Sequence, residues 1–141
     1  LSTLLTWMAE NTKPVFIVAT SNDISELPPE LVRKGRLDEV FFVDLPDAQV
    51  RTEIFRIHLE KRGLKASNFE LSALADATDG FTGAEIEESI VSARYLATSR
   101  SESMGQADLL AAVNRTYPMS VMRGESIAAL RSWAKDRTVL A

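Results

Sequence analysis

The chain has 141 residues, 45% hydrophobic and 26% charged, which is typical of one globular domain or of a small domain with part of another. Its net charge of −4 argues against a general nucleic-acid-binding role, because attraction to phosphates requires clustered positive charge. The absence of cysteine excludes disulfides, cysteine-ligated zinc and thiol catalysis, and no run of about 20 apolar residues could cross a membrane.

The first 45 residues have the pattern of an α/β domain. Leucines and a methionine at helical spacing predict a helix over residues 1–10, and the β-branched run at residues 15–20 predicts a strand buried on both faces of a parallel sheet. The prolines at 28–29 predict a short helix that ends at Gly35, and residues 40–43 predict a second strand. Two strands do not make a stable parallel sheet, so we expect additional N-terminal strands in the parent domain.

After Pro46 the sequence predicts helices and no strand. In the first of these helices, which ends near Gly63, we expect Val50, Ile54, Ile57 and His58 to form the inner face. The remaining predicted helices cover residues 69–77, 82–97, 106–115 and 125–135. The domain boundary therefore falls at about residue 45, with an α/β piece over residues 1–45 and a helical domain over residues 46–141.

Asn22 lies at the carboxyl end of the first predicted strand. Ligands of open α/β sheets bind beyond these strand ends, and an Asn amide can donate to a phosphate oxygen while its carbonyl accepts from an attacking water. The alternative is that Asn22 and Asp23 cap a turn, and this segment alone favours the cap.

Arg33 and Arg36 flank Gly35 in the segment R-K-G-R-L-D. Two guanidinium groups at this spacing can bind anionic oxygens at a helix end. The alternative is a solvated basic turn paired with Asp38 or Glu39, worth at most about 1 kcal/mol. Without further context, the solvated turn is the simpler interpretation.

The order of these segments resembles the AAA-proper branch of the AAA+ ATPases, which includes the FtsH proteases, the proteasomal ATPases and valosin-containing protein. The matching run is an apolar strand, T-S-N, a proline-containing helix, R-x-G-R-L-D, a second apolar strand and D-L-P-D. The resemblance implies that Asn22 is sensor 1 and that Arg33 and Arg36 are arginine fingers contributed to a neighbouring subunit. Leu37 stands where the family usually has Phe. The segments L-L-T-W-M, A-T-S-N-D-I and L-P-P-E-L are most similar to the ycf-type AAA ATPases of plastids and bacteria.

The resemblance extends into the helical part. R-T-E-I-F-R-I-H at residues 51–58 is similar to the segment in which the family places an Ile and a His against adenine and ribose, here Ile54 and His58. G-F-T-G-A-E-I at residues 80–86 resembles the sensor 2 segment, which implies that Gly83 and Ala84 lie near the nucleotide. Without the family, a lone His on an apolar helix face is more often a satisfied core residue.

Three acidic residues, Glu85, Glu87 and Glu88, lie close together on the predicted helix that begins after Thr82. We expect them to form a solvated helix face. No histidine accompanies them at a ligand spacing, so we assign no metal to them.

The resemblance implies a fold that is α/β plus all-α: the C-terminal end of a Rossmann-like P-loop NTPase domain, followed by a helical lid. It also implies a parent that binds ATP with Mg²⁺, assembles with its own subunits into a ring, most simply a hexamer, and remodels an unknown protein substrate. We expect no nucleic-acid partner, and a location in the cytoplasm, or in the plastid stroma if the protein is plastid-encoded.

The chain contains neither G-x-x-x-x-G-K-[ST] nor an apolar strand ending in an acidic pair. It therefore has neither the phosphate-binding loop nor the Mg²⁺-binding carboxylates of this chemistry, and we expect a C-terminal fragment that is not catalytic alone. The alternative is a non-catalytic helical interaction domain derived from such a module. A nucleic-acid clamp or loader is less favoured, because it would require a basic face.

The isolated chain is expected to bind ATP weakly or not at all, because the backbone cradle for the phosphates is absent. Isothermal titration calorimetry with ATP and Mg²⁺ measures this directly. Micromolar, Mg²⁺-dependent affinity would contradict the prediction.

Overall fold

The computed structural model describes every residue except 1, 25–26, 33–36 and 136, and gives no side-chain account of Ser2 and Val32. The described part is mostly helical with a short parallel sheet. It divides into two compact units, Val43–Trp133 and Leu1–Phe42 together with Ala134–Ala141. No helix in the described ranges is long and apolar enough to cross a membrane.

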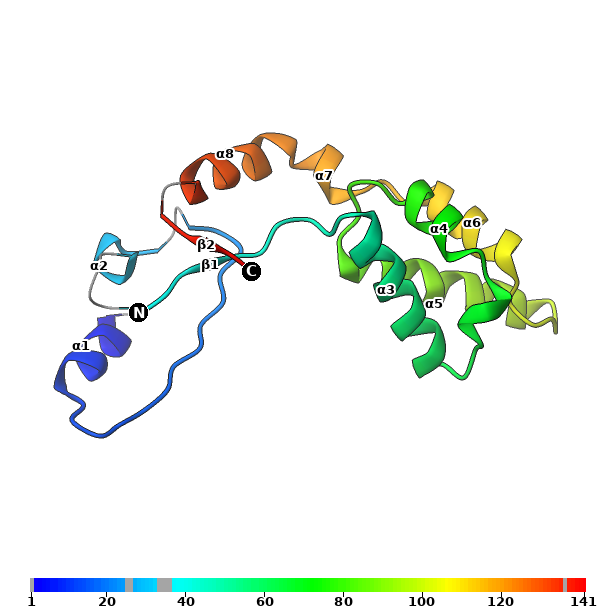
Figure 1. Cartoon of the computed structure of the whole chain (residues 1–141). Helices are drawn as coiled ribbons and strands as arrows, with labels where there is room; N and C mark the ends of the chain where they lie inside the picture. The colour runs from blue at the N-terminus through cyan, green and yellow to red at the C-terminus, as the bar shows by residue number, and fades with distance from the viewer. Residues whose placement is uncertain (1, 25–26, 33–36, 136) are drawn as a thin grey trace. The chain divides into compact units, whose positions relative to one another are not determined.

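The Val43–Trp133 unit is built from helices. Its helices are α3 (Ala48–Lys61), the 3₁₀ turn η1 (Ala66–Asn68), α4 (Leu71–Ala77), α5 (Gly83–Ser99), α6 (Gln106–Arg115), α7 (Met119–Met122) and α8, which runs over Gly124–Ala134. Helix α3 packs against α4 and α5, and α6 packs against α5 and α4, so these four helices enclose one core (Figure 1). The helices predicted from residue 48 onward are confirmed, with shifts of one or two residues at most ends.

The core of this unit is apolar and draws on every one of these four helices. Its largest fully buried apolar side chains are those of Phe55, Leu59, Leu74, Ile86, Ile90, Leu109 and Val113. The predicted inner face of α3 is wrong, because Val50 and Ile57 are 48% and 47% exposed, while Arg51, Phe55 and Leu59 are buried. The apolar residues of α3 itself lie on several sides of the helix, so their periodicity alone does not identify the face that packs against the core.

Helix α3 is closed at both ends by local hydrogen bonds. The Asp47 carboxylate accepts from the backbone N–H of Val50 at 2.8 Å, which satisfies one of the free donors of the first turn. At the other end, Gly63 adopts a positive φ of 75° and donates to the Glu60 carbonyl, while Leu64 N–H donates to the Leu59 carbonyl. This is the Schellman arrangement, in which glycine takes the left-handed position without a steric cost.

Arg51 is a buried charged residue at the start of α3, with only 5% of its surface exposed. Its Nε donates to the carbonyl of Ala75 at 3.0 Å, and its Nη1 donates to the carbonyl of Pro46 at 2.8 Å. Asp79, 3.5 Å from Nη1, is almost fully exposed and adds little. The guanidinium therefore ties the segment before α3 to the end of α4.

The second unit contains the short parallel sheet. Strand β1 (Phe41–Phe42) pairs with β2 (Val139–Leu140), with Phe41 opposite Val139 and Phe42 opposite Leu140. Helices α1 (Ser2–Glu10) and α2 (Pro29–Val32) belong to the same unit and confirm the predicted helices there; the predicted stop at Gly35 lies outside the described residues. The prediction of no strand after Pro46 is wrong, because Val139–Leu140 pairs with β1 through backbone hydrogen bonds that link distant parts of the chain. Assignment of all of residues 46–141 to one domain stays a prediction, although residues 134–141 group with the first unit in this structure.

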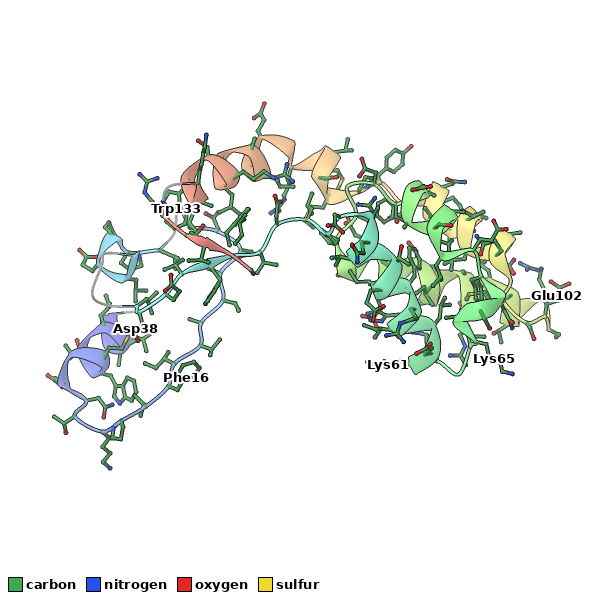
Figure 2. All side chains as sticks on the ribbon, in the orientation of Figure 1. Phe16, Asp38, Lys61, Lys65, Glu102 and Trp133 are labelled. Atoms are coloured by element: carbon green, nitrogen blue, oxygen red, sulfur yellow. The ribbon has the colours of Figure 1, made fainter. Side chains whose placement is uncertain are left out.

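The predicted buried strand at residues 15–20 is wrong in this structure. The segment has no strand pairing, and Val15, Phe16 and Val18 are 54%, 93% and 77% exposed. Figure 2 shows Phe16 on this extended segment. A strand of a parallel sheet exists only when its backbone bonds to neighbours, and its apolar faces are buried only when helices cover them. Among the described residues, no neighbouring strand pairs with this segment and no helix covers its apolar side chains.

Replacement of Arg51 by Met should lower the free energy of unfolding by about 3 kcal/mol, because two hydrogen bonds from a buried charged donor are lost while the apolar stem is kept. Thermal and urea unfolding followed by helical circular dichroism measures the change. Arg56→Met on the same helix is the matched control, since Arg56 pairs with Glu53 and Glu60 at the surface. Equal losses in the two variants would contradict the anchoring role of Arg51.

Candidate functional site

The contact between α3 and α5 brings together three of the sequence-predicted site residues. Ile54 and His58 are one turn apart on α3, and Gly83 is the first residue of α5. We call this region the α3–α5 seam and define it by Ile54, His58, Arg62, Gly83 and Glu87. Residues four apart on a helix share one side, which explains why Ile54, His58 and Arg62 follow the same line.

Helix α5 begins at the seam because of a capping box. The Thr82 hydroxyl accepts from the Glu85 backbone N–H at 3.3 Å, and the Glu85 carboxylate accepts from the Thr82 backbone N–H at 2.7 Å. This reciprocal pair confirms the capped start predicted from T-G-A-E and fixes where the first turn of α5 lies.

Gly83 and Ile54 meet across the seam. A Cβ at Gly83 would lie 3.6 Å from Ile54 Cδ1, an ordinary van der Waals contact, so the two residues lie close together across the seam. Ile54 is half-buried against the core, and Ala84, the next residue of α5, is exposed. Ile54 and Gly83 are therefore neighbours across the seam, and Ala84 is exposed next to Gly83 in the chain.

His58 lies in a charged group on the same seam. Its Nδ1 is 3.2 Å from Arg62 Nη1 and 3.3 Å from Glu87 Oε1. Arg62 Nη2 donates to Glu87 Oε1 at 2.6 Å, and this hydrogen bond is the main reason that the pKa of Glu87 lies below its usual range. His58 is thus partly accessible and hydrogen-bonded at one nitrogen, not a fully enclosed core residue: its side chain is 21% exposed.

The acidic residues of α5 do more than form a solvated face, so that prediction is wrong for two of the three. Glu85 closes the capping box, and its other oxygen accepts from the Met119 backbone N–H at 2.6 Å, which anchors the start of α7. Glu87 pairs with Arg62 and faces His58. Glu88 alone is an exposed carboxylate without a hydrogen bond to any described residue. Among the described residues no cluster of histidine and carboxylate side chains could hold a metal.

The remaining predicted site residues lie in the other unit or outside the described residues. Asn22 lies on an exposed bend, and the turn is held by Ser21, whose hydroxyl donates to the Asp23 carbonyl at 2.8 Å. The described part of the chain gives the Asn22 amide no hydrogen-bond partner, so it does not act as the cap. Arg33 and Arg36 lie outside the described residues.

Two residues of the seam, Arg62 and Glu87, are not among the site residues predicted from the sequence. Arg62 carries a usable signal, because it follows His58 by four residues and so lies on the same side of the predicted helix. Glu87 carries none that points to His58, since it lies 29 residues away in a helix whose partner is decided by packing.

Comparison of the sequence with known proteins identifies its family. Residues 1–45 match the family described as ATPase family associated with various cellular activities (AAA). The chain belongs to the AAA family. It is 43% identical over 135 residues to the uncharacterized AAA domain-containing protein ycf46 of Gracilaria tenuistipitata var. liui, an alignment covering 95% of this chain and 28% of that protein.

Two further relatives have named activities. The chain is 40% identical over 102 residues to the proteasome-activating nucleotidase of Saccharolobus solfataricus, covering 72% of this chain and 26% of the relative. It is 37% identical over 133 residues to the ATP-dependent zinc metalloprotease FtsH 2 of Sphaerobacter thermophilus, covering 94% of this chain and 20% of the relative. The chain thus spans less than a third of the length of each of these proteins.

Replacement of Glu85 by Ala should lower the free energy of unfolding by about 1–2 kcal/mol, because the capping box is lost together with the anchor of α7. Glu88→Ala, an exposed carboxylate one turn further along α5, is the matched control and should change it little. Urea unfolding of the two variants measures the difference. Indistinguishable midpoints would show that the Glu85 hydrogen bonds contribute nothing net.

Proposed function

We propose that the parent of this chain binds and hydrolyses ATP with Mg²⁺ as a ring of its own subunits, most simply a hexamer, and remodels a protein or protein complex. In this proposal residues 1–45 are the C-terminal part of a Rossmann-like nucleotide-binding domain, and residues 46–141 form its helical lid. The observation that carries it is the α3–α5 seam, where Ile54, Gly83 and His58 come together in a member of the AAA family.

The seam has the chemistry that a nucleoside requires. An aromatic base packs on apolar surface, and the Ile54 side chain beside the side-chain-free Gly83 offers such a surface with room for close approach. The His58 imidazole supplies a hydrogen-bonding nitrogen one helical turn away. Ala84, exposed beside Gly83, extends the apolar part, and no acid–base step is required of His58.

The catalytic roles are assigned to the other unit. Asn22 would orient the attacking water beside the γ-phosphate, and its exposed amide, without a hydrogen-bond partner among the described residues, is free to do so. Arg33 and Arg36 would extend into the nucleotide site of the neighbouring subunit and stabilise the charge that develops in the transition state. When bound, Mg²⁺ neutralises phosphate charge; its carboxylate ligands are not in this chain.

The names of two relatives support this choice over other AAA-derived roles. One is called a nucleotidase and another ATP-dependent, and both align with this chain through the region of the seam. The cytoplasm, or the stroma for a plastid-encoded parent, is the proposed location.

A second candidate is a non-catalytic helical interaction domain. It is favoured by a surface groove of about 500 Å³ between α5 and α6, lined by Val91, Tyr95, Leu96 and Arg115 among others. Tyr95 is 75% exposed at this groove. An intact phosphate-binding loop in the parent would favour the ATPase, and a degraded one would favour the interaction domain.

Replacement of Arg33 or Arg36 by Ala in the full-length parent should lower ATP turnover by roughly 10³-fold or more, because an arginine finger acts on the transition state. Stability should remain within about 0.5 kcal/mol, as for ordinary surface changes, and ATP affinity should change little. Steady-state hydrolysis, thermal unfolding and nucleotide titration measure the three quantities. We expect the larger effect at Arg33.

Mixing provides the sharper test of action in trans. A ring that combines the arginine variant with a phosphate-loop variant contains interfaces at which an intact nucleotide site meets an intact arginine pair, so some hydrolysis should return. If mixed rings form and no activity returns, or if either Ala variant keeps full turnover, the assignment of Arg33 and Arg36 is wrong.

A further inference from the structure

His58 is the single histidine of the chain, and on the seam its ring contacts two charged side chains. Two groups of opposite hydrogen-bonding character face the same ring nitrogen: Arg62 Nη1 at 3.2 Å and Glu87 Oε1 at 3.3 Å from Nδ1. In the neutral imidazole, which of them bonds to Nδ1 decides where the ring carries its proton, and therefore whether Nε2 donates or accepts.

The contacts of Arg62 favour the guanidinium. Besides approaching Nδ1, Nη1 donates to the His58 carbonyl at 3.1 Å, and Nη2 donates to Glu87 Oε1 at 2.6 Å. The Arg62 side chain is 17% exposed and held from both helices. A guanidinium donates and never accepts, so a hydrogen bond between Nη1 and Nδ1 requires the lone pair of Nδ1. Glu87 is already engaged by Nη2 and remains ionised, because its hydrogen bond with Arg62 lowers its pKa.

We infer that Arg62 is a positioning residue that selects, for the neutral form of the His58 imidazole, the tautomer with its proton on Nε2. The described residues offer no hydrogen-bond partner to Nε2, so this N–H is available as a donor at the partly exposed edge of the seam. The identity of its acceptor rests on the proposed function. With a nucleoside on the seam, the donor would bond to an acceptor atom, a ring nitrogen of the base or an oxygen of the sugar, and not to an exocyclic amino group.

The single histidine makes the inference directly measurable. In the ¹⁵N-labelled 141-residue chain without nucleotide, a long-range ¹H–¹⁵N correlation spectrum at about pH 8.5, above the ordinary titration range of imidazole, distinguishes a protonated from an unprotonated ring nitrogen. We expect Nε2 to have the shift of a protonated nitrogen and Nδ1 that of an unprotonated one. The opposite assignment would overturn the inference on the unmodified chain alone.

Variants then test the role of Arg62. Arg62→Met removes the donor, so Glu87 can accept from Nδ1–H and the population protonated on Nδ1 should rise. Arg62→Lys keeps a donor and should restore the original tautomer, which a purely structural role would not require. Arg56→Met, an arginine on the same helix whose partners are Glu53 and Glu60, is the control and should leave the spectrum unchanged.

Each outcome is decisive for the inference. An unchanged spectrum in folded Arg62→Met, or an equal change in Arg56→Met, would show that Arg62 does not set the tautomer. Because the spectra are recorded without nucleotide, they are independent of the proposed function, which is tested by ATP affinity of His58→Ala in the full-length parent. Loss of the tautomer preference and loss of nucleotide binding are therefore separate results.

Discussion

The buried guanidinium of Arg51 is the interaction on which the arrangement of the helical unit depends. It lies at the start of α3. It donates one hydrogen bond to the carbonyl of Pro46, just before α3, and another to the carbonyl of Ala75 in α4. A buried charge is costly unless its donors are satisfied, so its burial specifies where these segments meet. Phe55 and Leu59 follow Arg51 at one-turn intervals and continue the same buried face into the core.

Burial of this face fixes the rotation of α3 about its axis, and the rotation decides which other residues of α3 lie against α5. With Arg51, Phe55 and Leu59 turned inward, the neighbouring line of Ile54, His58 and Arg62 comes to the edge of the core against α5. A single orientation of α3 thus positions both its core residues and its candidate site residues. A helix rotated to bury Val50 and Ile57 instead would have carried His58 to a different position.

The start of α5 joins the site to the segment that follows α6. Glu85 bonds to Thr82 with one oxygen and to the backbone of Met119 with the other, and Gly80 approaches Ser120 so closely that a Cβ there would lie 2.5 Å from its hydroxyl. A single short segment, residues 80–86, therefore caps α5, contacts Ile54 through Gly83, and holds α7. Changes in this segment are expected to affect both stability and the seam.

The sequence by itself determined the four core helices α3, α4, α5 and α6 but not the short α7, because caps and apolar periodicity are local: T-G-A-E specified the start of α5, and Gly63 the end of α3. It also identified Ile54, His58, Gly83 and Ala84 as candidates, through resemblance. The tertiary structure alone decided that Arg51 is buried, that Glu87 faces His58, and that β1 pairs with β2. These depend on contacts between residues 24, 29 and 98 positions apart. Residues 15–20 also show that sequence pattern does not decide long-range pairing. Their apolar run specifies which side chains could be buried, whereas a strand forms only where another backbone segment supplies its hydrogen bonds.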